Sequence, residues 1–266
     1  MMKKLSVLPL VLIVLTSAWS LGASSETAPS PNSRPPILIE LFTSEGCSSC
    51  PPADTFLEKL DSVQPVPTAE LIVLSEHVDY WNHDGWKDPF SSAFYSDRQN
   101  DYKSRFGLKS VYTPEMVVDG ASEFLGSDAH SAERALTQAI KSPKIPVTLS
   151  RLSIDASNTL QVHIESDALP ASSREKEADV YVAVALHHAE SDVLRGENAG
   201  HHLAYANVAQ TLKDVGVLRR GQAFSQDVSL KLEPGTDKNN LRIIAFVQEK
   251  HQGKVLGATI HSIEEK

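Results

Sequence analysis

The chain has 266 residues, of which 41% are hydrophobic and 22% are charged, and its formal net charge is −9. This composition is typical of a globular protein with one large or two modest domains. An acidic surface repels phosphate backbones and anionic lipid headgroups, so nucleic acid is not an expected partner.

The first 23 residues have the pattern of an export signal. Two lysines precede an apolar run over residues 5–15, and small residues follow, so cleavage is expected after Ser20 or Ala23. An uncleaved membrane anchor is the alternative, but the apolar run is shorter than the roughly 20 residues that a spanning helix needs. The sequence therefore predicts a periplasmic or secreted protein with no membrane contact after removal of a signal peptide over residues 1–23.

A change of composition follows the predicted signal peptide. Residues 24–36, SSETAPSPNSRPP, are rich in serine and proline and predict a flexible leader that buries no core. The next run, ILIELFT over residues 37–43, is apolar with one interior acid, which is the pattern of a buried strand.

The only two cysteines of the chain, Cys47 and Cys50, follow this strand and directly precede Pro51 and Pro52. Apolar residues on one face of the next segment, ADTFLEKLDSV, predict a helix, and proline is tolerated in a first turn. The cysteines are therefore expected at a helix N-terminus, where unpaired N–H groups and the helix dipole stabilise a thiolate. A bond between them would close a ring of about four residues, worth roughly 2 kcal/mol, so redox or metal chemistry explains the pair better than a structural staple.

The following segments alternate between strand and helix patterns. A second strand is expected over residues 71–80, and a loop with two tryptophans over residues 81–90. Helices are expected over residues 94–106 and 127–141, with a short strand over residues 116–118 between them. This alternation predicts an α/β domain.

The pattern changes after Pro143. Seven strand-like runs follow, several of them alternating apolar and polar residues, with turn signals between them. Such a series predicts an all-β sandwich-like domain. The boundary is expected where the segment SPKIP breaks the preceding helix, which divides the ordered chain into residues 37–143 and residues 144–266.

The first of these domains resembles the thioredoxin fold. Three features carry the resemblance: the strand ILIELFT, the two cysteines opening a helix as Cys-Ser-Ser-Cys, and Thr113-Pro114 directly before a strand. The resemblance implies an α/β thioredoxin-like domain in which the peptide bond before Pro114 is cis and Pro114 lies beside the cysteines. Two positions depart from ordinary thioredoxins: Gly46 stands where they have tryptophan, and Pro51 is expected to push the cysteine before it away from helical backbone angles.

Longer motifs resemble a narrower family. The runs ELFTSEGCSSCPPAD, HVDYW…GWKDPF, YTPEMVVDG and RGENAGHH…NV are similar to bacterial secreted proteins grouped as domain of unknown function 1223, over nearly the whole mature chain. That family is described as thioredoxin-like. The last motif implies that Arg195, Glu197 and Asn198 contact the first domain.

The first functional hypothesis is a thiol–disulfide oxidoreductase that acts on protein thiols or disulfides without a cofactor. Cys47, nearer the exposed turn, would attack as a thiolate, and Cys50 would resolve the mixed disulfide. A carboxylate, Glu45 or Asp54, would accept the proton. Four further residues would hold or face the substrate, although the tryptophans could equally be packing residues: Thr113, Pro114, Trp81 and Trp86.

Two alternatives remain open. Two thiolates and an imidazole suit Cu(I), so Cys47, Cys50 and His77 would be the ligands in a copper-binding or copper-delivery protein; a hydrogen-bonded His77 that anchors the tryptophan-containing loop is the simpler explanation of that residue. The second alternative is a non-catalytic interaction protein whose β-rich part binds a partner. The histidine pairs at residues 187–188 and 201–202 are expected to lie on the surface of a hairpin.

Overall fold

The computed structural model describes Met2 and residues 34–171, 173 and 175–263. Apart from Met2, the predicted signal peptide lies outside the described residues, as do residues 24–33 of the predicted leader. The end of that leader is part of the fold, because the N–H of Glu70 donates to the carbonyl oxygen of Pro35 at 3.0 Å and Pro36 begins the first strand. Within the described residues, no helix combines the length and the apolar character that crossing a membrane requires.

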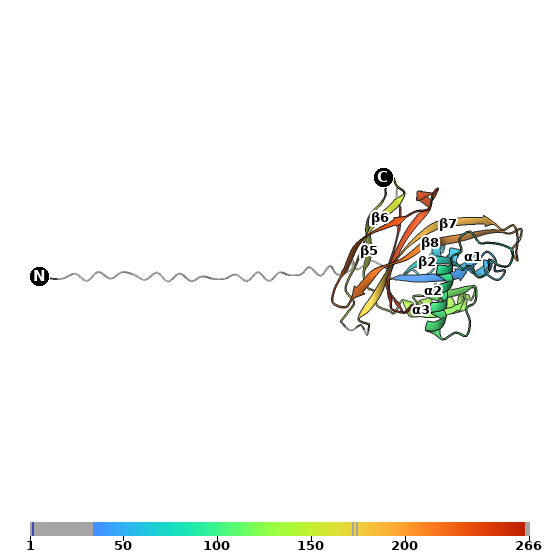
Figure 1. Ribbon diagram of the computed structural model, residues 1–266. Helices are drawn as coiled ribbons and strands as arrows, with labels where there is room; N and C mark the ends of the chain where they lie inside the picture. The colour runs from blue at the N-terminus through green and yellow to red at the C-terminus, as the bar shows by residue number, and fades with distance from the viewer. Residues whose placement is uncertain (1, 3–33, 172, 174, 264–266) are drawn as a thin grey trace. The chain divides into compact units, whose positions relative to one another are not determined.

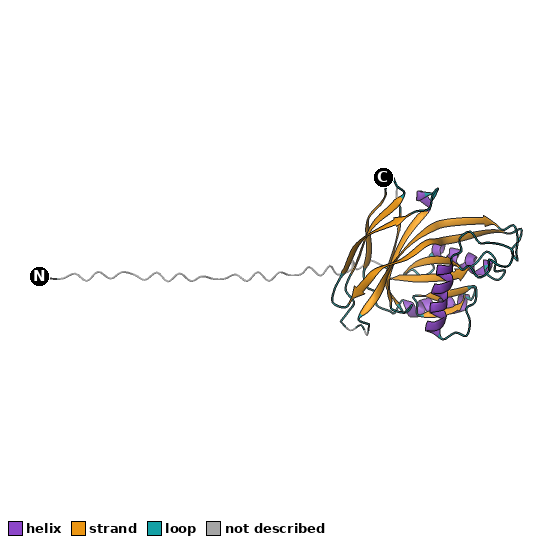
Figure 2. Ribbon diagram, viewed as in Figure 1, coloured by secondary structure: helices purple, strands orange, loops and turns teal. Residues whose placement is uncertain are grey.

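Strands dominate the described part of the chain (Figure 2). Every helix and strand that the sequence predicts is present, although the second strand ends at His77 instead of residue 80. The elements follow one another in the order β1 (Pro36–Thr43), α1 (Pro51–Val63), β2 (Glu70–His77), α2 (Ala93–Phe106), β3 (Glu115–Val118), β4 (Ser122–Leu125), α3 (Ala129–Ala139), β5 (Val147–Ile154), β6 (Thr159–Ser166), β7 (Glu177–Asp192), β8 (His202–Arg219), β9 (Phe224–Lys231), the 3-10 helix η1 (Lys238–Asn240), β10 (Leu241–Glu249) and β11 (Val255–Ser262).

One mixed sheet runs through both halves of the chain (Figure 1). Its strands lie in the order β11-β10-β7-β8-β2-β1-β3-β4, and β5-β6-β9 form a second, smaller sheet. The halves join where Ser75 of β2 pairs with Val208 of β8 in parallel. The predicted fold class, an α/β thioredoxin-like domain followed by a separate all-β sandwich-like domain, is therefore wrong. The backbone groups on the outer edge of β2 need hydrogen-bond partners, and the C-terminal half supplies them through β8.

Strands β1 and β2 are buried on both faces. Ile39 and Leu41 pack with Leu57 of α1 and Leu136 of α3, whereas the neighbouring Leu38 belongs to the cluster that contains Tyr95 of α2. Strands covered on both faces are apolar at nearly every position, which explains the continuous run in ILIELFT.

The small sheet covers another part of the large one. Val162 of β6 and Val228 of β9 share a buried cluster with Val182 of β7 and Ile243 of β10. In the small sheet, the alternating burial along β5 and β9 fits a sheet with one face on the core and one in solvent. The large sheet is thus covered by helices at its β1–β2 part and by strands at its β7–β10 part.

The long hairpin of β7 and β8 belongs to the C-terminal half of the chain and extends to the start of α1. Its pairing extends from Glu177 opposite Arg219 to Asp192 opposite His202. The 16 residues of β7 extend over about 50 Å at the usual rise of a strand. The strands run past the small sheet towards α1 (Figure 1), so the loop that joins them, residues 193–201, is brought to the candidate site. We call it the hairpin loop.

Gly120 lies where the β3–β4 turn meets the β10–β11 turn. Its φ is +58°, and a Cβ atom there would stand 2.1 Å from the carbonyl oxygen of Gly253. Gly120→Ala is expected to lower the free energy of unfolding by about 2–3 kcal/mol, because the new atom strains the left-handed backbone and meets another backbone. Gly235→Ala is the matched control, since its φ is +80° but nothing lies within 4 Å of the added Cβ. Denaturant unfolding of both variants should show the larger loss at residue 120, and equal losses would contradict this account.

Candidate functional site

The two cysteines lie in the connection between β1 and α1, residues 44–50, which we call the cysteine loop. The N–H of Cys47 donates to the carbonyl oxygen of Ser44, and the N–H of Cys50 donates to that of Cys47, both at 3.1 Å. These turns bring the Cα atoms of the cysteines to 5.4 Å, and a disulfide joins their sulfurs. The pair is therefore present in its oxidised form.

The start of α1 differs from the expectation in one respect. Cys50 adopts helical backbone angles, φ −78° and ψ −38°, and the helix begins at Pro51 without delay. The N–H groups of Ala53 and Asp54 both donate to the Cys50 carbonyl oxygen, at 2.8 and 3.1 Å, which overrides the tendency of Pro51 to disfavour these angles.

The donors available to a thiolate also differ from the expectation. Pro51 and Pro52 have no N–H, so the first turn of α1 offers the sulfurs fewer backbone donors than a usual helix start. The Ser49 hydroxyl lies 3.4 Å from the sulfur of Cys47. In the disulfide-bonded form this hydroxyl donates its one proton to the Thr113 carbonyl oxygen, and it lies close enough to turn to a Cys47 thiolate after reduction.

Both cysteines are fully buried, whereas Ser48 and Ser49 between them are exposed. The hairpin loop bonds the backbone on either side of Cys47. The amide of Asn198 donates to the carbonyl oxygens of Glu45 and Cys47, at 2.9 and 3.0 Å. Two elements far apart in sequence are thus joined directly over the disulfide.

A second pair of hydrogen bonds fastens the hairpin loop at its exposed rim. The carboxylate of Glu197 accepts from the N–H of Ser48 at 3.2 Å and from its hydroxyl at 2.6 Å. The predicted contact of Glu197 and Asn198 with the first part of the chain is confirmed, and Arg195 is exposed.

Both tryptophans of the loop after β2 hydrogen-bond next to the cysteines. Trp86 donates to the carboxylate of Glu45 at 2.6 Å, and Trp81 donates to the hydroxyl of Thr113 at 2.8 Å. Gly46 is required beneath Trp81, because a Cβ atom there would stand 2.9 Å from the Cβ of Trp81. The tryptophans therefore support the cysteine loop, and a substrate-facing role for them stays a prediction.

Thr113 and Pro114 are placed beside the cysteines. The peptide bond between them is cis, as the resemblance to thioredoxins implies. The Ser49 hydroxyl donates to the Thr113 carbonyl oxygen at 3.4 Å. Gly126 lies between this turn and α1 and lets them pack closely, because a Cβ atom at residue 126 would stand 3.2 Å from Pro114 and 3.1 Å from Ala53.

A buried group of polar side chains surrounds His77 behind the cysteine loop; we call it the His77 cluster. Its imidazole Nδ1 bonds the Asp88 carboxylate at 2.7 Å, and that carboxylate also accepts from the Glu45 N–H at 2.9 Å. The ring packs edge-on against Tyr205 of β8, with centroids 4.7 Å apart. Asp54 of α1 completes the cluster, and all five side chains are buried.

Burial and mutual charge set the protonation of the His77 cluster. Burial alone would lower the pKa of His77, but the charge and hydrogen bond of Asp88, together with the charges of Asp54 and Glu45, outweigh burial and the pKa is raised. Burial would raise the pKa of Asp88, and the charge of His77 reverses that effect, so the pKa is lowered. Burial raises the pKa of Asp54 to about 7 and, together with Asp88, raises that of Glu45. An ion pair thus lies beside two carboxyl groups that hold protons more readily than usual.

No group of three or more His, Cys, Asp or Glu side chains within the described ranges is arranged to hold a metal ion. Cu(I) ligation by Cys47, Cys50 and His77 would require the reduced thiolates and stays a prediction. The hydrogen bond of His77 to Asp88 agrees with the simpler explanation, a histidine that anchors the loop after β2. The histidines of the β7–β8 hairpin are surface residues, as expected: His188 pairs with Glu190 at 3.0 Å.

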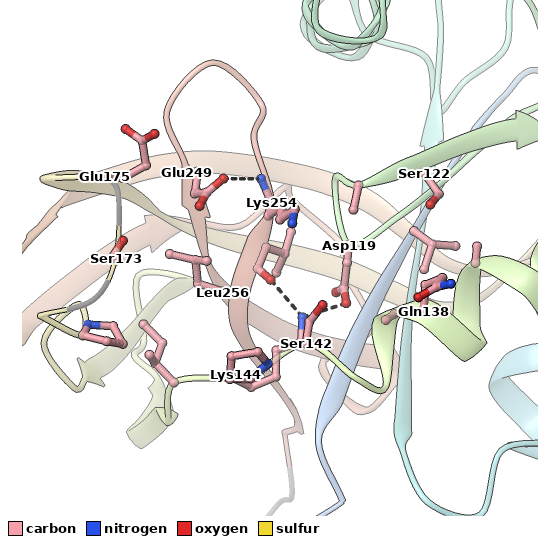
Figure 3. A pocket seen from close by; sticks show the side chains of 18 residues that line it. Asp119, Ser122, Gln138, Ser142, Lys144, Ser173, Glu175, Glu249, Lys254 and Leu256 are labelled. Carbon is pink, nitrogen blue, oxygen red and sulfur yellow. Dashed lines mark hydrogen bonds and ion pairs between the residues drawn. The ribbon is translucent and has the colours of Figure 1, made fainter.

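A cavity of about 700 Å³ lies elsewhere, between α3, the β3–β4 turn and the β10–β11 hairpin. Asp119 and Lys144 lie next to each other in it (Figure 3), with Nζ of Lys144 2.7 Å from the Asp119 carboxylate. Lys144 also donates to the carbonyl oxygen of Val255 at 2.8 Å. None of the predicted site residues lines this cavity, and its two most buried charges are already paired, so it is not the candidate site.

Tyr205 is the member of the His77 cluster that sequence reasoning missed. It lies in the run HLAYANV, where an aromatic residue at an apolar position looks like ordinary strand packing. Only the pairing of β8 with β2 brings it next to His77. No signal within the sequence of β8 could have identified it.

A family model described as a protein of unknown function (DUF1223) matches residues 38–248. The comparison with curated proteins gives no match. The crystal structure of a structural-genomics target from Agrobacterium tumefaciens is 26% identical, with a TM-score of 0.64 over 86% of this chain and 96% of that one. HBP35 of Porphyromonas gingivalis is 12% identical, with a TM-score of 0.63 over 87% of this chain and 76% of that chain. This second likeness is one of fold alone.

Proposed function

The chain belongs to the DUF1223 family of proteins of unknown function, and from that premise we propose that it catalyses thiol–disulfide exchange through Cys47 and Cys50. The observation that carries the proposal is the disulfide between residues three apart, set beside Thr113 and Pro114 at the start of a helix. A ring this small contributes roughly 2 kcal/mol as a staple, whereas a larger ring contributes up to about 5. A reversible bond explains the arrangement better.

The surroundings of the disulfide support this chemistry. The unit formed by β1, the cysteine loop and α1, with Thr113-Pro114 beside it, is the part of the chain that we propose to be thioredoxin-like, although no separate domain of that kind is formed. Asp54 lies one helical turn after Cys50 and has a pKa of about 7. A carboxyl group with this pKa gives and accepts protons near neutral pH.

The exchange proceeds by displacement at sulfur. A substrate thiolate attacks the sulfur of Cys47, a bond forms between these two sulfurs, and the Cys47–Cys50 bond breaks with its electron pair on Cys50. The proton of the Asp54 carboxyl group neutralises the Cys50 thiolate. A second substrate thiolate then attacks the substrate sulfur that is bonded to Cys47. Cys47 departs as a thiolate and takes a proton from solvent, so the substrate becomes a disulfide and the protein a dithiol. Oxidation of the protein follows the same steps in reverse.

We propose that the substrates are protein thiols or disulfides outside the cytoplasm, in the periplasm or in the secreted space. The N-terminal sequence supports this, because a basic start, an apolar run and small residues are typical of an export signal. Disulfides form and persist in such compartments, so an exchangeable pair has both oxidised and reduced partners there.

Access to the buried sulfurs requires the hairpin loop to move, and Asn198 holds it. Asn198→Ala removes two hydrogen bonds to the cysteine loop, and is expected to increase the rate of disulfide reduction by dithiothreitol about 10-fold, since two such bonds contribute on the order of 1–2 kcal/mol. Quenched alkylation and mass spectrometry measure this rate. Asn240→Ala is the control, because Asn240 makes two comparable bonds to His188. Unchanged reduction of the Asn198 variant would contradict a covering role.

The proposed function is tested with a peptide that contains two cysteines. The oxidised full-length chain is mixed with the reduced peptide, and the reduced chain with the oxidised peptide, and both products are followed by mass spectrometry. We expect one peptide disulfide for each protein disulfide consumed in the first reaction, and the converse in the second. A variant with both cysteines replaced by serine provides the background. No transfer above that background in either direction would reject the proposal and leave the non-catalytic interaction protein.

A further inference from the structure

We infer that His77, held by Asp88, is a positioning residue that keeps the proton of Asp54 available to the sulfur of Cys50. This inference rests on the proposed exchange reaction and deepens it, because it names the residues that supply a proton to the leaving sulfur of Cys50. The device combines residues of β2, α1, the cysteine loop, the tryptophan-containing loop and β8.

The first observation is a set of buried polar atoms without hydrogen-bond partners. The Nδ1 atom of His77 is bonded to Asp88, but its Nε2 atom has no partner. The hydroxyl of Tyr205 also has none, and one oxygen each of Asp54 and Glu45 lacks a direct hydrogen bond, although the side chains of Thr43 and Ser191 lie close enough to lower their pKa values. Each unpartnered buried group costs about 1–3 kcal/mol. Unpartnered polar atoms that gather around one imidazole are candidates for a catalytic role.

The second observation is that the His77 ring is fixed on every side. Asp88 holds one nitrogen at 2.7 Å, and the rings of Tyr205 and Phe90 pack edge-on at centroid distances of 4.7 and 5.4 Å. Asp88 is itself oriented, because it accepts from the N–H groups of Glu45 and Phe90, each at 2.9 Å. The imidazole therefore presents its free nitrogen in one direction only.

The third observation is the distribution of charge. The pKa of His77 is raised and that of Asp88 is lowered, because the protonated imidazole and the ionised carboxylate stabilise each other. The positive charge of His77 counteracts the rise that burial causes in the pKa of Asp54, whereas Asp88 and Glu45 act in the opposite direction. Burial, followed by the nearby Asp88, raises the pKa of Glu45, and burial raises the pKa of Tyr205 far above its usual range, so the Tyr205 hydroxyl keeps its proton.

These observations define the proton step. When a thiolate attacks Cys47, the electron pair of the broken bond stays on Cys50, and the Asp54 proton moves to that sulfur. The resulting Asp54 carboxylate is then stabilised by the imidazolium of His77. In the reverse direction, the Cys50 thiol returns its proton to Asp54 as the sulfur attacks the mixed disulfide. Asp54 is placed for this because it lies one turn after Cys50, with its N–H on the Cys50 carbonyl oxygen at 3.1 Å.

The experiment measures the rate at which dithiothreitol reduces the full-length chain between pH 5 and pH 9, corrected for the thiolate fraction of the reagent. In the wild type we expect the corrected rate to fall above about pH 7, as Asp54 loses its proton. His77→Gln keeps a polar group beside Asp88 but cannot carry the charge. Its profile should fall at a pH about one unit higher, because the carboxylate loses its positive neighbour, and its rate at pH 6 should be at least threefold lower. Asp54→Asn should show no such step.

His163→Gln is the matched control, because His163 bonds Asp227 at 2.6 Å in the small sheet, apart from the His77 cluster. Its profile should equal that of the wild type.

If the His77→Gln profile also equals the wild type, the inference is overturned and the exchange function stands. If the wild type is not reduced at any pH while folded, both fail. If His77→Gln does not fold, ¹⁵N NMR of the wild type decides: His77 should be an imidazolium at pH 7, and a neutral ring would overturn the inference.

Discussion

Cys47→Ser is expected to abolish exchange, and Cys50→Ser is expected to stop the reaction at a stable mixed disulfide. With serine at residue 47, the sulfur that Ser49 and the cysteine loop present to the substrate is missing. With serine at residue 50, Cys47 still forms a bond to the substrate, but no second sulfur resolves it. The asymmetry between the two variants identifies Cys47 as the attacking sulfur.

Incubation with oxidised glutathione and intact-mass spectrometry measure this asymmetry. We expect a single glutathione adduct on the Cys50→Ser chain and much slower formation of an adduct on the Cys47→Ser chain. The doubly substituted chain has no thiol, because these are the only two cysteines of the sequence, and it gives the background. Equal adduct formation on both single variants would contradict the assigned roles.

Arg98→Met is expected to cost more stability than any other single change proposed above, about 3–5 kcal/mol. Arg98 is 3% exposed, and it bonds the Glu40 carboxylate through Nε at 2.8 Å and the Gln248 side chain at 3.0 Å. It thereby ties α2 to β1 and to β10. Removing the guanidinium leaves Glu40 buried without its positive partner, and breaking a buried pair in this way costs far more than the intact pair contributes.

Guanidinium chloride unfolding compares this variant with a surface pair. Arg219 is 60% exposed and bonds Glu177 at 3.1 Å, so Arg219→Met should change the free energy of unfolding by less than about 1 kcal/mol. Glu76 lies 3.6 Å from Arg98, and burial followed by the nearby Glu40 raises its pKa. Glu76 is also acidic, so it cannot neutralise Glu40 when Arg98 is removed. Similar losses in the two arginine variants would show that the buried network does not anchor α2.

Local structure was predictable where physical signals are local. The proline-rich start of α1, the apolar runs of β1 and β2 and the alternating strands after Pro143 each depend on neighbours within a few residues, and all are present. The position of Thr113 and Pro114 beside the cysteines was available only through the resemblance to thioredoxins, since no local pattern joins residues that far apart.

The arrangement of the sheet was not predictable in the same way. The apolar residues of β8 show that this strand is buried, but they do not show which strand β8 pairs with. The single bridge between Ser75 and Val208 merges the two predicted domains into one sheet. Tyr205 and Asn198 reach the candidate site as a consequence of that pairing, and the first of these could not be identified from the sequence.

The burial of the cysteines was also unexpected. A turn with two serines and a glycine indicates an exposed loop, and Ser48 and Ser49 are indeed exposed. The cysteines are nevertheless buried, and the hairpin loop, about 150 residues later in the chain, bonds the carbonyl oxygens of Glu45 and Cys47 next to them. A prediction from local composition has no access to a contact of this range.

We propose that the bond between Cys47 and Cys50 is an exchangeable redox couple and not a permanent staple. The most direct test equilibrates the folded full-length chain with glutathione buffers of stepwise redox potential and counts its thiols by alkylation. The account predicts one two-electron transition with a midpoint above about −300 mV, where redox-active pairs are found. A disulfide that persists at every glutathione potential, and is reduced only when the chain unfolds, would contradict it.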